Sequence, residues 1–497
     1  MIPPSRPGRM ASVSAPTSQS TAGGPRLDLR LAGAWRWAPW LPAAWAAVLM
    51  TALIVAFVPV GWPVVDLYEV LYKAYALPWR EAVPDAFTRG LQFRPGFTLL
   101  VKAFYDAVDV TLWVYKTLIV LQHVAIVALL VWVLQPTSKA RALAACLAVS
   151  IFLGLHSSRI LFAFFPIGHH SLALLLLLLA MAVCLAPRHR LSDWLPGLVA
   201  FTALMLIELG VIVPPIVTVL WLLRAPGASR RGVTGTWVAL AVYAAIRLTF
   251  GDTSEVEIFS SETGLGFTPQ VSIERLSDIF GQAPWLLVAY NVTATALSVL
   301  LSEPRDGVFE FVRDQLEGRT AAWQYLHLGS SVLATMLAVS AIRGWRARDD
   351  RDRQLIAAGV ACFVLGCALA FVYARDRMGL VPGVGYVMLV YVAASALLER
   401  ARPALHRLAS ALLLATLLVA WSVRDLEAGF ALRDTAWESW QEWTVRWEEL
   451  GAGRSQTDLL ERLRRQALAS PAADPRCDPA WTFDLLERWT RRPDCPR

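Results

Sequence analysis

The first residues able to do chemistry are two acids and an arginine that follow the first long apolar stretch. Asp66 and Glu69 lie three residues apart in GWPVVDLYEVLYKAY, a segment with amphipathic helical spacing. Arg94 stands directly before Pro95, so we expect an extended residue at a helix start, with its guanidinium at a membrane surface. A carboxylate there can accept a proton from a hydroxyl, and a guanidinium can bind a phosphate. The alternatives are a solvated loop acid and a snorkelling arginine.

Three histidines form a second group of candidates. His156, His169 and His170 lie in LHSSRILFAFFPIGHH, between two apolar stretches. Their spacing does not match a closed tetrahedral metal site, and no thiol accompanies them. The sequence therefore favours interfacial histidines over a metal centre, and a divalent cation as cofactor stays open.

Glu208 is a carboxylate among apolar residues, in LMLIELGVIVPP. Burying such a group is expensive, so it should pair with a cation, face a polar cavity or stay protonated. A purely structural ion pair is the alternative to a functional role.

Two further arginines flank an acid in VYARDRMGLVPGVGYVMLVY. Arg375 and Arg377 are predicted at the outer end of an apolar span, where positive charge runs against the usual orientation rule. The guanidinium fork matches phosphate oxygens, so this pair suits a lipid phosphate.

Transmembrane helices must position these residues, because the composition is that of a membrane protein. The chain is 56% hydrophobic and 17% charged, against about 25% charged in soluble domains. Its apolar residues gather in uncharged blocks of about 17 to 25, the length that spans a bilayer. Strands of β-barrels never give such runs. The net charge of +7 comes from arginines in short loops and indicates no nucleic-acid partner. The fold class predicted is an all-α polytopic bundle of about ten or eleven spans.

The spans and their orientation follow from hydropathy and from Lys and Arg. Basic residues in the N-terminal segment and in five interspan loops fall on one side, predicted to be cytoplasmic, if the apolar stretch 283–302 is interfacial or re-entrant. A large first loop, 61–111, then lies on the extracytoplasmic side. The spans are expected near 41–60, 112–134, 140–156, 169–187, 194–210, 211–223, 233–250, 322–342, 355–374, 380–398 and 406–423. Because Pro214 and Pro215 follow Glu208, the pair 194–210 and 211–223 is either two short helices or one bent helix.

Two terminal segments flank the predicted transmembrane domain, 41–423. Residues 1–40 read as a disordered cytoplasmic tail, and 424–497 as an extracytoplasmic helical tail. Four tryptophans at helical spacing, from Trp437 to Trp447, predict a stripe resting on the membrane surface or on the core. Cys477 and Cys495 in this tail are expected to form a disulfide.

In this order, the features resemble the C-type glycosyltransferase superfamily, nearest to protein O-mannosyltransferases and their relatives. The motifs are the acid that opens the first outer loop, the Arg94-Pro95 pair, the loop beginning with His156, Glu208 with downstream prolines, and the late arginine loop before Gly385-Tyr386. The likeness covers roughly residues 41–423. It departs from the family in the absence of a second acid directly after Asp66.

The resemblance implies a polytopic enzyme of the cell membrane that moves a hexose, with inversion, from a polyprenyl-phosphate donor to a protein or glycan acceptor at the extracytoplasmic face. Asp66 would be the catalytic base. The substrate-binding residues would be Glu69, Arg94, His156, Glu208, Arg375 and Arg377. Membrane lipid is the other expected partner. The alternatives are a transporter or lipid flippase, and a catalytically inactive relative that acts as a membrane assembly protein.

Overall fold

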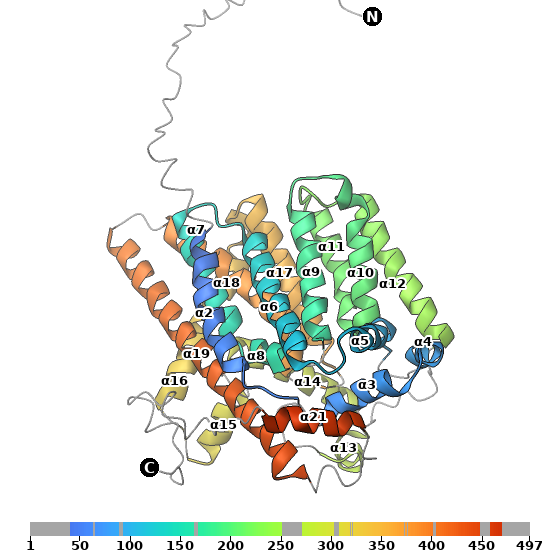
Figure 1. The fold of residues 1–497 in the computed structure, drawn as a ribbon. Coiled ribbons are helices and arrows are strands. Elements are labelled where there is room, and N and C mark those ends of the chain that lie inside the picture. The colour runs from blue at the N-terminus through green and yellow to red at the C-terminus, as the bar shows by residue number, and fades with distance from the viewer. Residues whose placement is uncertain are drawn as a thin grey trace, which may run out of the picture. The chain divides into compact units, whose positions relative to one another are not determined.

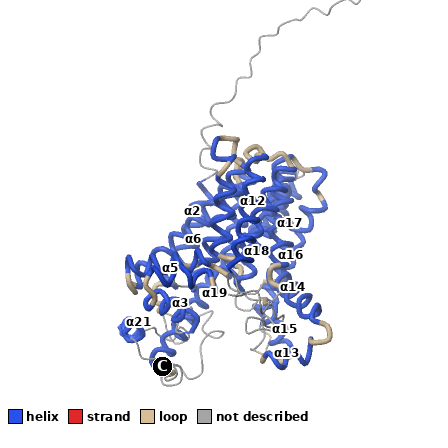
Figure 2. The backbone as a smooth tube through the Cα atoms, turned by 90° about the vertical axis from the view of Figure 1, so that its right-hand side faces the viewer, coloured by secondary structure: helices blue, strands red, loops and turns tan. Residues whose placement is uncertain are grey.

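The computed structural model describes residues 40–62, 65–88, 93–163, 167–250, 271–302, 308–318, 320, 322–371, 373–374, 376–400, 404–447 and 458–469. For residues 65–69, 160, 161, 163, 308, 310 and 376 it describes the backbone alone. Every element in these ranges is a helix (Figure 2). Residues 1–39, Arg375, Cys477 and Cys495 lie outside the described part.

Six of the described helices are long and apolar enough to cross a membrane: α2 (Trp40–Phe57), α6 (Leu112–Leu134), α12 (Arg230–Phe250), α16 (Ala322–Arg343), α18 (Leu380–Arg400) and α19 (Ala404–Thr444). A bent pair, α13 with α14, would be a seventh by length and composition. Figure 1 shows α7 (Lys139–Gly154), α9 (His169–Leu185) and α17 (Asp350–Ala368) running alongside them. The chain is therefore an all-α polytopic membrane protein, because a helix satisfies its own backbone hydrogen bonds in lipid.

Helix α18 is the centre of the bundle. Of the most apolar window in this helix, 94% is buried inside the protein, whereas the corresponding share for α12 is 17%. Small residues let its neighbours approach closely: a Cβ on Gly385 would lie 2.3 Å from the carbonyl oxygen of Gly359 on α17. Helix α12 is accordingly a peripheral helix, with most of its surface available to lipid.

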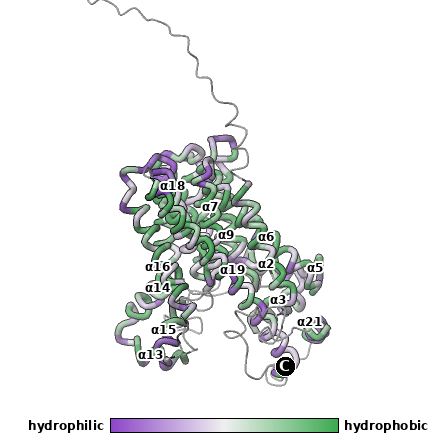
Figure 3. The backbone as a smooth tube through the Cα atoms, turned by 90° about the vertical axis from the view of Figure 1, so that its left-hand side faces the viewer, coloured by the Kyte–Doolittle hydropathy of each residue, from purple (hydrophilic) through white to green (hydrophobic). Residues whose placement is uncertain are grey.

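The basic loops share one end of the bundle, as the sequence predicted. At the start of α7, Arg141 forms ion pairs with Asp349 and Asp352 near the start of α17 and with Glu399 near the end of α18, at 3.2–3.3 Å. Arg351 donates hydrogen bonds to carbonyl oxygens at the ends of α6 and α9. We call this the Arg-rich end. Figure 3 shows hydrophilic residues gathered there and hydrophobic ones along the middle of the bundle.

The segment around Glu208 forms a hairpin of two short helices, one of the two alternatives that the sequence left open. Helix α10 (Leu195–Leu206) leaves the Arg-rich end after the 3₁₀ turn η2 (Arg190–Asp193), and η3 (Glu208–Ile212) and α11 (Val213–Leu222) return the chain to it. Helix α10 rises only ~18 Å at 1.5 Å per residue. The spans expected at 194–210 and 211–223 are thus two short helices, and Glu208 begins the turn between them.

The stretch 283–302 enters the bundle without crossing it. Helix α13 (Ile273–Phe280) and α14 (Pro284–Leu300) meet at a bend of 107°. The end of α14 touches the middle of α16, where Thr335 donates a hydrogen bond of 2.6 Å to the carbonyl of Leu300. Helix α15 (Val308–Leu316) lies beside the first turn of α16, since Gln324 donates to Asp314 at 2.7 Å. The chain therefore returns to the end from which it came, as the re-entrant interpretation predicts.

Further helices cover the end opposite the Arg-rich end: α3 (Val65–Ala76), α4 (Trp79–Phe87), α5 (Pro95–Val108) and α21 (Asp458–Ala469). Helix α21 packs through its buried leucines, and its Arg462 pairs with Asp109 after α5. The remaining elements are α8 (His156–Ala163), η4 (Trp345–Ala347) and η5 (Asp376–Gly379).

Helix α19 continues without a break through residue 423, where the sequence placed the end of the last span. Its 41 residues extend ~60 Å, about twice the bilayer core. Trp437, Trp440 and Trp443 of the tryptophan stripe lie on its last turns, and Trp447 follows its end. Trp443 is 1% exposed and donates a hydrogen bond to the carbonyl of Trp62. The stripe therefore packs on the protein core, one of the two alternatives for it.

Candidate functional site

An ion pair between Arg94 and Glu208 joins two segments 114 residues apart. The Arg94 Nε lies 3.0 Å from Glu208 Oε2, and the two side chains are 23% and 30% exposed. Arg94 is the residue before α5, which begins at Pro95 as the Arg-Pro sequence predicts. The start of α5 packs closely on the end of α10, which sets the position of Arg94: a Cβ on Gly96 would lie 2.8 Å from the carbonyl oxygen of Met205. Of the alternatives for Glu208, the structure shows the pair with a cation.

Two buried histidines continue this cluster. His169 and His170 begin α9 and are each 4% exposed. The Nε2 of His169 lies 3.5 Å from Arg94 Nη1, and its ring centroid is 4.3 Å from those of Phe97 and His170. Gly168, with φ of 62°, makes the sharp turn into the helix that sets both rings here. Arg94, His169 and Glu208 thus meet although the sequence separates them widely.

Arg377 lies much later in the chain than Arg94, yet it interacts with the same two histidines. It lies in η5, and its guanidinium interacts electrostatically with both imidazoles, as that of Arg94 does. Two guanidinium groups from segments 283 positions apart in the numbering therefore interact electrostatically with one pair of buried rings. Such a group of donors inside an apolar bundle suits an anion, because guanidinium forks match phosphate or carboxylate oxygens.

His156 lies next to η5 in a neighbouring polar layer. It begins α8, is fully buried, and its Nδ1 lies 3.3 Å from the Oγ of Ser302 after α14. A Cβ on Gly379, the last residue of η5, would come within 3.2 Å of the Ser157 side chain. The re-entrant segment thus brings its end to the elements that hold His156 and Arg377.

A buried charged group on α19 was missed by sequence reasoning. Arg424 and Asp425 are both fully buried, and His327 Nε2 lies 3.3 Å from Glu427 Oε1. The Arg424 guanidinium lies 4.1 Å from the Trp421 ring centroid and donates to the carbonyl of His327. Neither carboxylate oxygen of Asp425 has a hydrogen-bond partner among the described residues. The available signal was the charged string after the apolar run, which belongs to the predicted extracytoplasmic helical tail, 424–497.

This charged group adjoins the His156 layer. A Cβ on Gly154, two residues before His156, would lie 3.3 Å from the Cβ of Arg424. Arg424 also interacts electrostatically with Tyr386, whose hydroxyl lies 3.1 Å from the Thr335 Oγ1. Tyr386 belongs to the Gly-Tyr motif on α18. A continuous polar layer therefore crosses the bundle near the end opposite the Arg-rich end.

Several candidates cannot be placed in this layer. Asp66 and Glu69 lie on α3, which packs against α5, but their side chains are outside the described part. Arg375, Cys477 and Cys495 are outside it altogether, so the predicted disulfide stays a prediction. The four cysteines that the structure describes are free and buried within helices.

No group of three or more His, Cys, Asp and Glu side chains among the described residues is arranged to hold a metal ion. The histidines of the cluster instead contact arginine, aromatic rings and serine. The cluster of Arg94, His169, His170 and Arg377 can donate hydrogen bonds and supply positive charge in an apolar surrounding.

Comparisons with known proteins add nothing to this geometry: no protein-family model, no curated protein and no solved structure matches the chain.

Proposed function

We propose that this chain is a membrane glycosyltransferase that moves a hexose, with inversion, from a polyprenyl-phosphate donor to a protein or glycan acceptor. The reaction takes place at the end of the bundle opposite the Arg-rich end. In the cell membrane, the N-terminus and the Arg-rich end face the cytoplasm and the C-terminus the extracytoplasmic side, following the orientation rule for positive loops.

The observation that carries the proposal is that Arg94, which lies 3.5 Å from His169, and Arg377 both interact electrostatically with the buried His169–His170 pair. Partly buried cations are costly in an apolar bundle and mark binding sites for charged substrates. A polyprenyl-phosphate sugar carries its phosphate at the membrane surface and its chain in the lipid, so its binding site must be cationic and close to the membrane.

In the proposed reaction the acceptor hydroxyl attacks the anomeric carbon while the bond from that carbon to the phosphate oxygen breaks. Asp66 takes the hydroxyl proton as general base. Arg377, together with Arg375, offsets the charge that develops on the leaving phosphate. Glu208 holds Arg94 in position by their ion pair. Glu69 and His156 complete the substrate site.

The test is transfer of label from a polyprenyl-phosphate [¹⁴C]hexose by membranes that contain the protein and supply the acceptor. Asp66→Asn is expected to lower the rate about 10²–10⁴-fold, the usual cost of removing a general base, with expression unchanged. Glu81→Gln, an exposed carboxylate on the neighbouring α4, is the matched control and should keep full activity. Wild-type turnover in Asp66→Asn would remove Asp66 from this role.

A transporter or lipid flippase is the second candidate, and one observation favours it. The chain breaks at Glu208 between two short helices, α10 and α11, and discontinuous helices with an ionisable residue at the break are typical of transporters. Proteoliposomes loaded with the labelled donor distinguish the two: movement of the intact lipid between leaflets without loss of its sugar would favour the flippase.

A further inference from the structure

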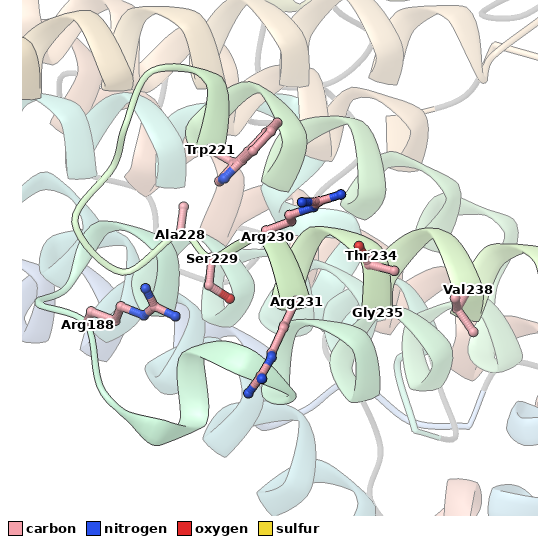
Figure 4. Close-up of a pocket in the computed structure, with 9 residues that line it drawn as sticks. All are labelled: Arg188, Trp221, Ala228, Ser229, Arg230, Arg231, Thr234, Gly235 and Val238. Atoms are coloured by element: carbon pink, nitrogen blue, oxygen red, sulfur yellow. The ribbon is translucent and has the colours of Figure 1, made fainter.

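An open pocket of about 910 Å³ lies at the Arg-rich end, far from the candidate site along the bundle. Figure 4 shows side chains from the loop after α9, the end of α11, the loop before α12 and the start of α12 around it. Its polar lining consists of Arg188, Ser229, Arg230, Arg231 and Thr234, and its apolar lining includes Trp221 and Val238.

Tight turns hold the pocket walls in place. A Cβ on Gly227 would lie 2.1 Å from the carbonyl oxygen of Val183, and the Gly227 N–H donates to the carbonyl of Cys184 at 2.9 Å. The Ser229 hydroxyl donates to the carbonyl of Ser192 at 3.1 Å and accepts from the Gly232 N–H at 2.9 Å. The loops are thus joined by backbone contacts that do not depend on the arginine side chains.

The pocket carries an excess of positive charge. Asp193 lies between two of its arginines, 3.1 Å from Arg188 Nη2 and 3.8 Å from Arg231 Nη1. The neighbouring Ser229 hydroxyl and the charges of these arginines hold the pKa of Asp193 below its ordinary value. Arg230, beside Trp221 in Figure 4, forms no ion pair with any residue that the structure describes. Three cations against one anion leave a net charge of about +2.

The wall that follows the pocket along α12 is apolar and exposed. Trp237 and Val238 on α12 are 45% and 54% exposed, and Leu222 at the end of α11 is 65% exposed. An exposed apolar surface on a membrane protein faces lipid chains, and tryptophan favours the level of the headgroups. A cationic pocket therefore lies directly above a surface that acyl chains cover.

We propose that this pocket binds the phosphate headgroup of an anionic phospholipid of the leaflet at the Arg-rich end, with its acyl chains along the exposed face of α12. Arg188 and Arg230 bind the phosphate oxygens, the Thr234 hydroxyl hydrogen-bonds to the headgroup, and Trp221 lies at the glycerol level. Neighbouring cationic side chains at a membrane surface attract anionic lipids in this way. The proposal is independent of the activity proposed above.

Native mass spectrometry of the detergent-purified full chain tests this site, with phosphatidylglycerol as probe. The variant is Arg188→Gln/Arg230→Gln. The control is Arg343→Gln/Arg346→Gln, which removes the same charge from exposed arginines at the same end but outside the pocket. We expect phosphatidylglycerol affinity to fall on the order of tenfold or more in the pocket variant and to be nearly unchanged in the control.

Two further probes identify the source of the phosphate. Phosphatidylcholine should bind more weakly than phosphatidylglycerol, and inorganic phosphate at millimolar concentration should not displace the lipid. Equal phosphatidylglycerol affinity in the pocket variant and the wild type would overturn the proposal, as would equal binding of phosphatidylcholine. Displacement by inorganic phosphate would reassign the pocket to a soluble phosphate. Unchanged melting temperatures of both variants show that the fold is intact.

Discussion

At the residue scale, the decisive feature is that charged groups inside the bundle meet partners that the sequence does not place beside them. Arg94 pairs with Glu208 and lies beside His169, and Arg424 donates a hydrogen bond to the carbonyl of His327. Each contact offsets part of the cost of taking a charge out of water. A buried pair of this kind contributes little net stability, yet removing one partner leaves the other charge uncompensated.

Arg94→Gln and Glu208→Gln should each lower the free energy of unfolding by about 1–3 kcal/mol, because each leaves its partly buried partner unpaired. The double variant should lose less than the sum of the two. The measurement is a double-mutant cycle from denaturant unfolding in detergent micelles.

The exposed pair Arg353–Asp350, at 2.6 Å with side chains 41% and 85% exposed, is the control for this cycle. Its removal should change stability by less than about 0.5 kcal/mol. Strict additivity at Arg94 and Glu208 would show that the ion pair contributes no coupling energy.

At the element scale, the site depends on helices that stop short, break or bend. The α10–η3–α11 hairpin turns at Glu208, α14 ends against the middle of α16, and η5 leads into α18. These interruptions bring polar groups into a bundle of otherwise continuous apolar helices. Irregular backbone is tolerated in a membrane only where protein or a polar cavity surrounds it. The interruptions therefore locate the interior where a substrate could bind.

Close packing of α17 on α18 can be tested with two alanine substitutions. Gly385→Ala puts a Cβ 2.3 Å from the carbonyl of Gly359, so it should separate the helices and cost about 1–3 kcal/mol of stability. Gly329→Ala on α16 meets nothing within 4 Å and should be neutral or stabilise by up to about 1 kcal/mol through helix propensity. Thermal unfolding in detergent compares the two, and equal melting temperatures would refute the packing argument.

At the scale of the whole molecule, the two ends of the bundle differ in charge and in structure. Short loops with arginines and acids join the helices at the Arg-rich end, and amphipathic helices with the long extension of α19 cover the other. This asymmetry fits an orientation in which the Arg-rich end faces the cytoplasm. The candidate site and the proposed lipid pocket then lie on opposite sides of the membrane.

Cysteine labelling in intact cells tests that orientation. In a background with Cys477 and Cys495 replaced by serine, Arg465→Cys on α21 should react with a membrane-impermeant maleimide, because that position is exposed at the end opposite the Arg-rich end, which the proposed orientation places outside the cell. Arg346→Cys at the Arg-rich end should react only after permeabilisation. The reverse pattern would invert the topology and move the candidate site to the cytoplasmic side.

The sequence by itself determined the all-α membrane class, the position of several apolar helices and which loops share one end of the bundle. Apolar length and flanking charge are local properties, so the predicted spans 112–134 and 380–398 agree with α6 and α18 to within two residues, and Arg94-Pro95 marked the start of α5. The basic loops could be assigned to one end because the charge rule needs only the order of the spans.

Only the tertiary structure decided which side chains meet. Partners such as Arg94 and Glu208 depend on how helices distant in sequence pack, and no local pattern encodes that packing. The same limit explains why the burial of Arg424 and Asp425 was not predicted: a charged string after an apolar run looks the same whether the helix ends there or continues into a covered extension. Burial depends on what lies around a helix. The neighbouring helices α7, α8 and α16 cover this part of α19 and bury Arg424 and Asp425.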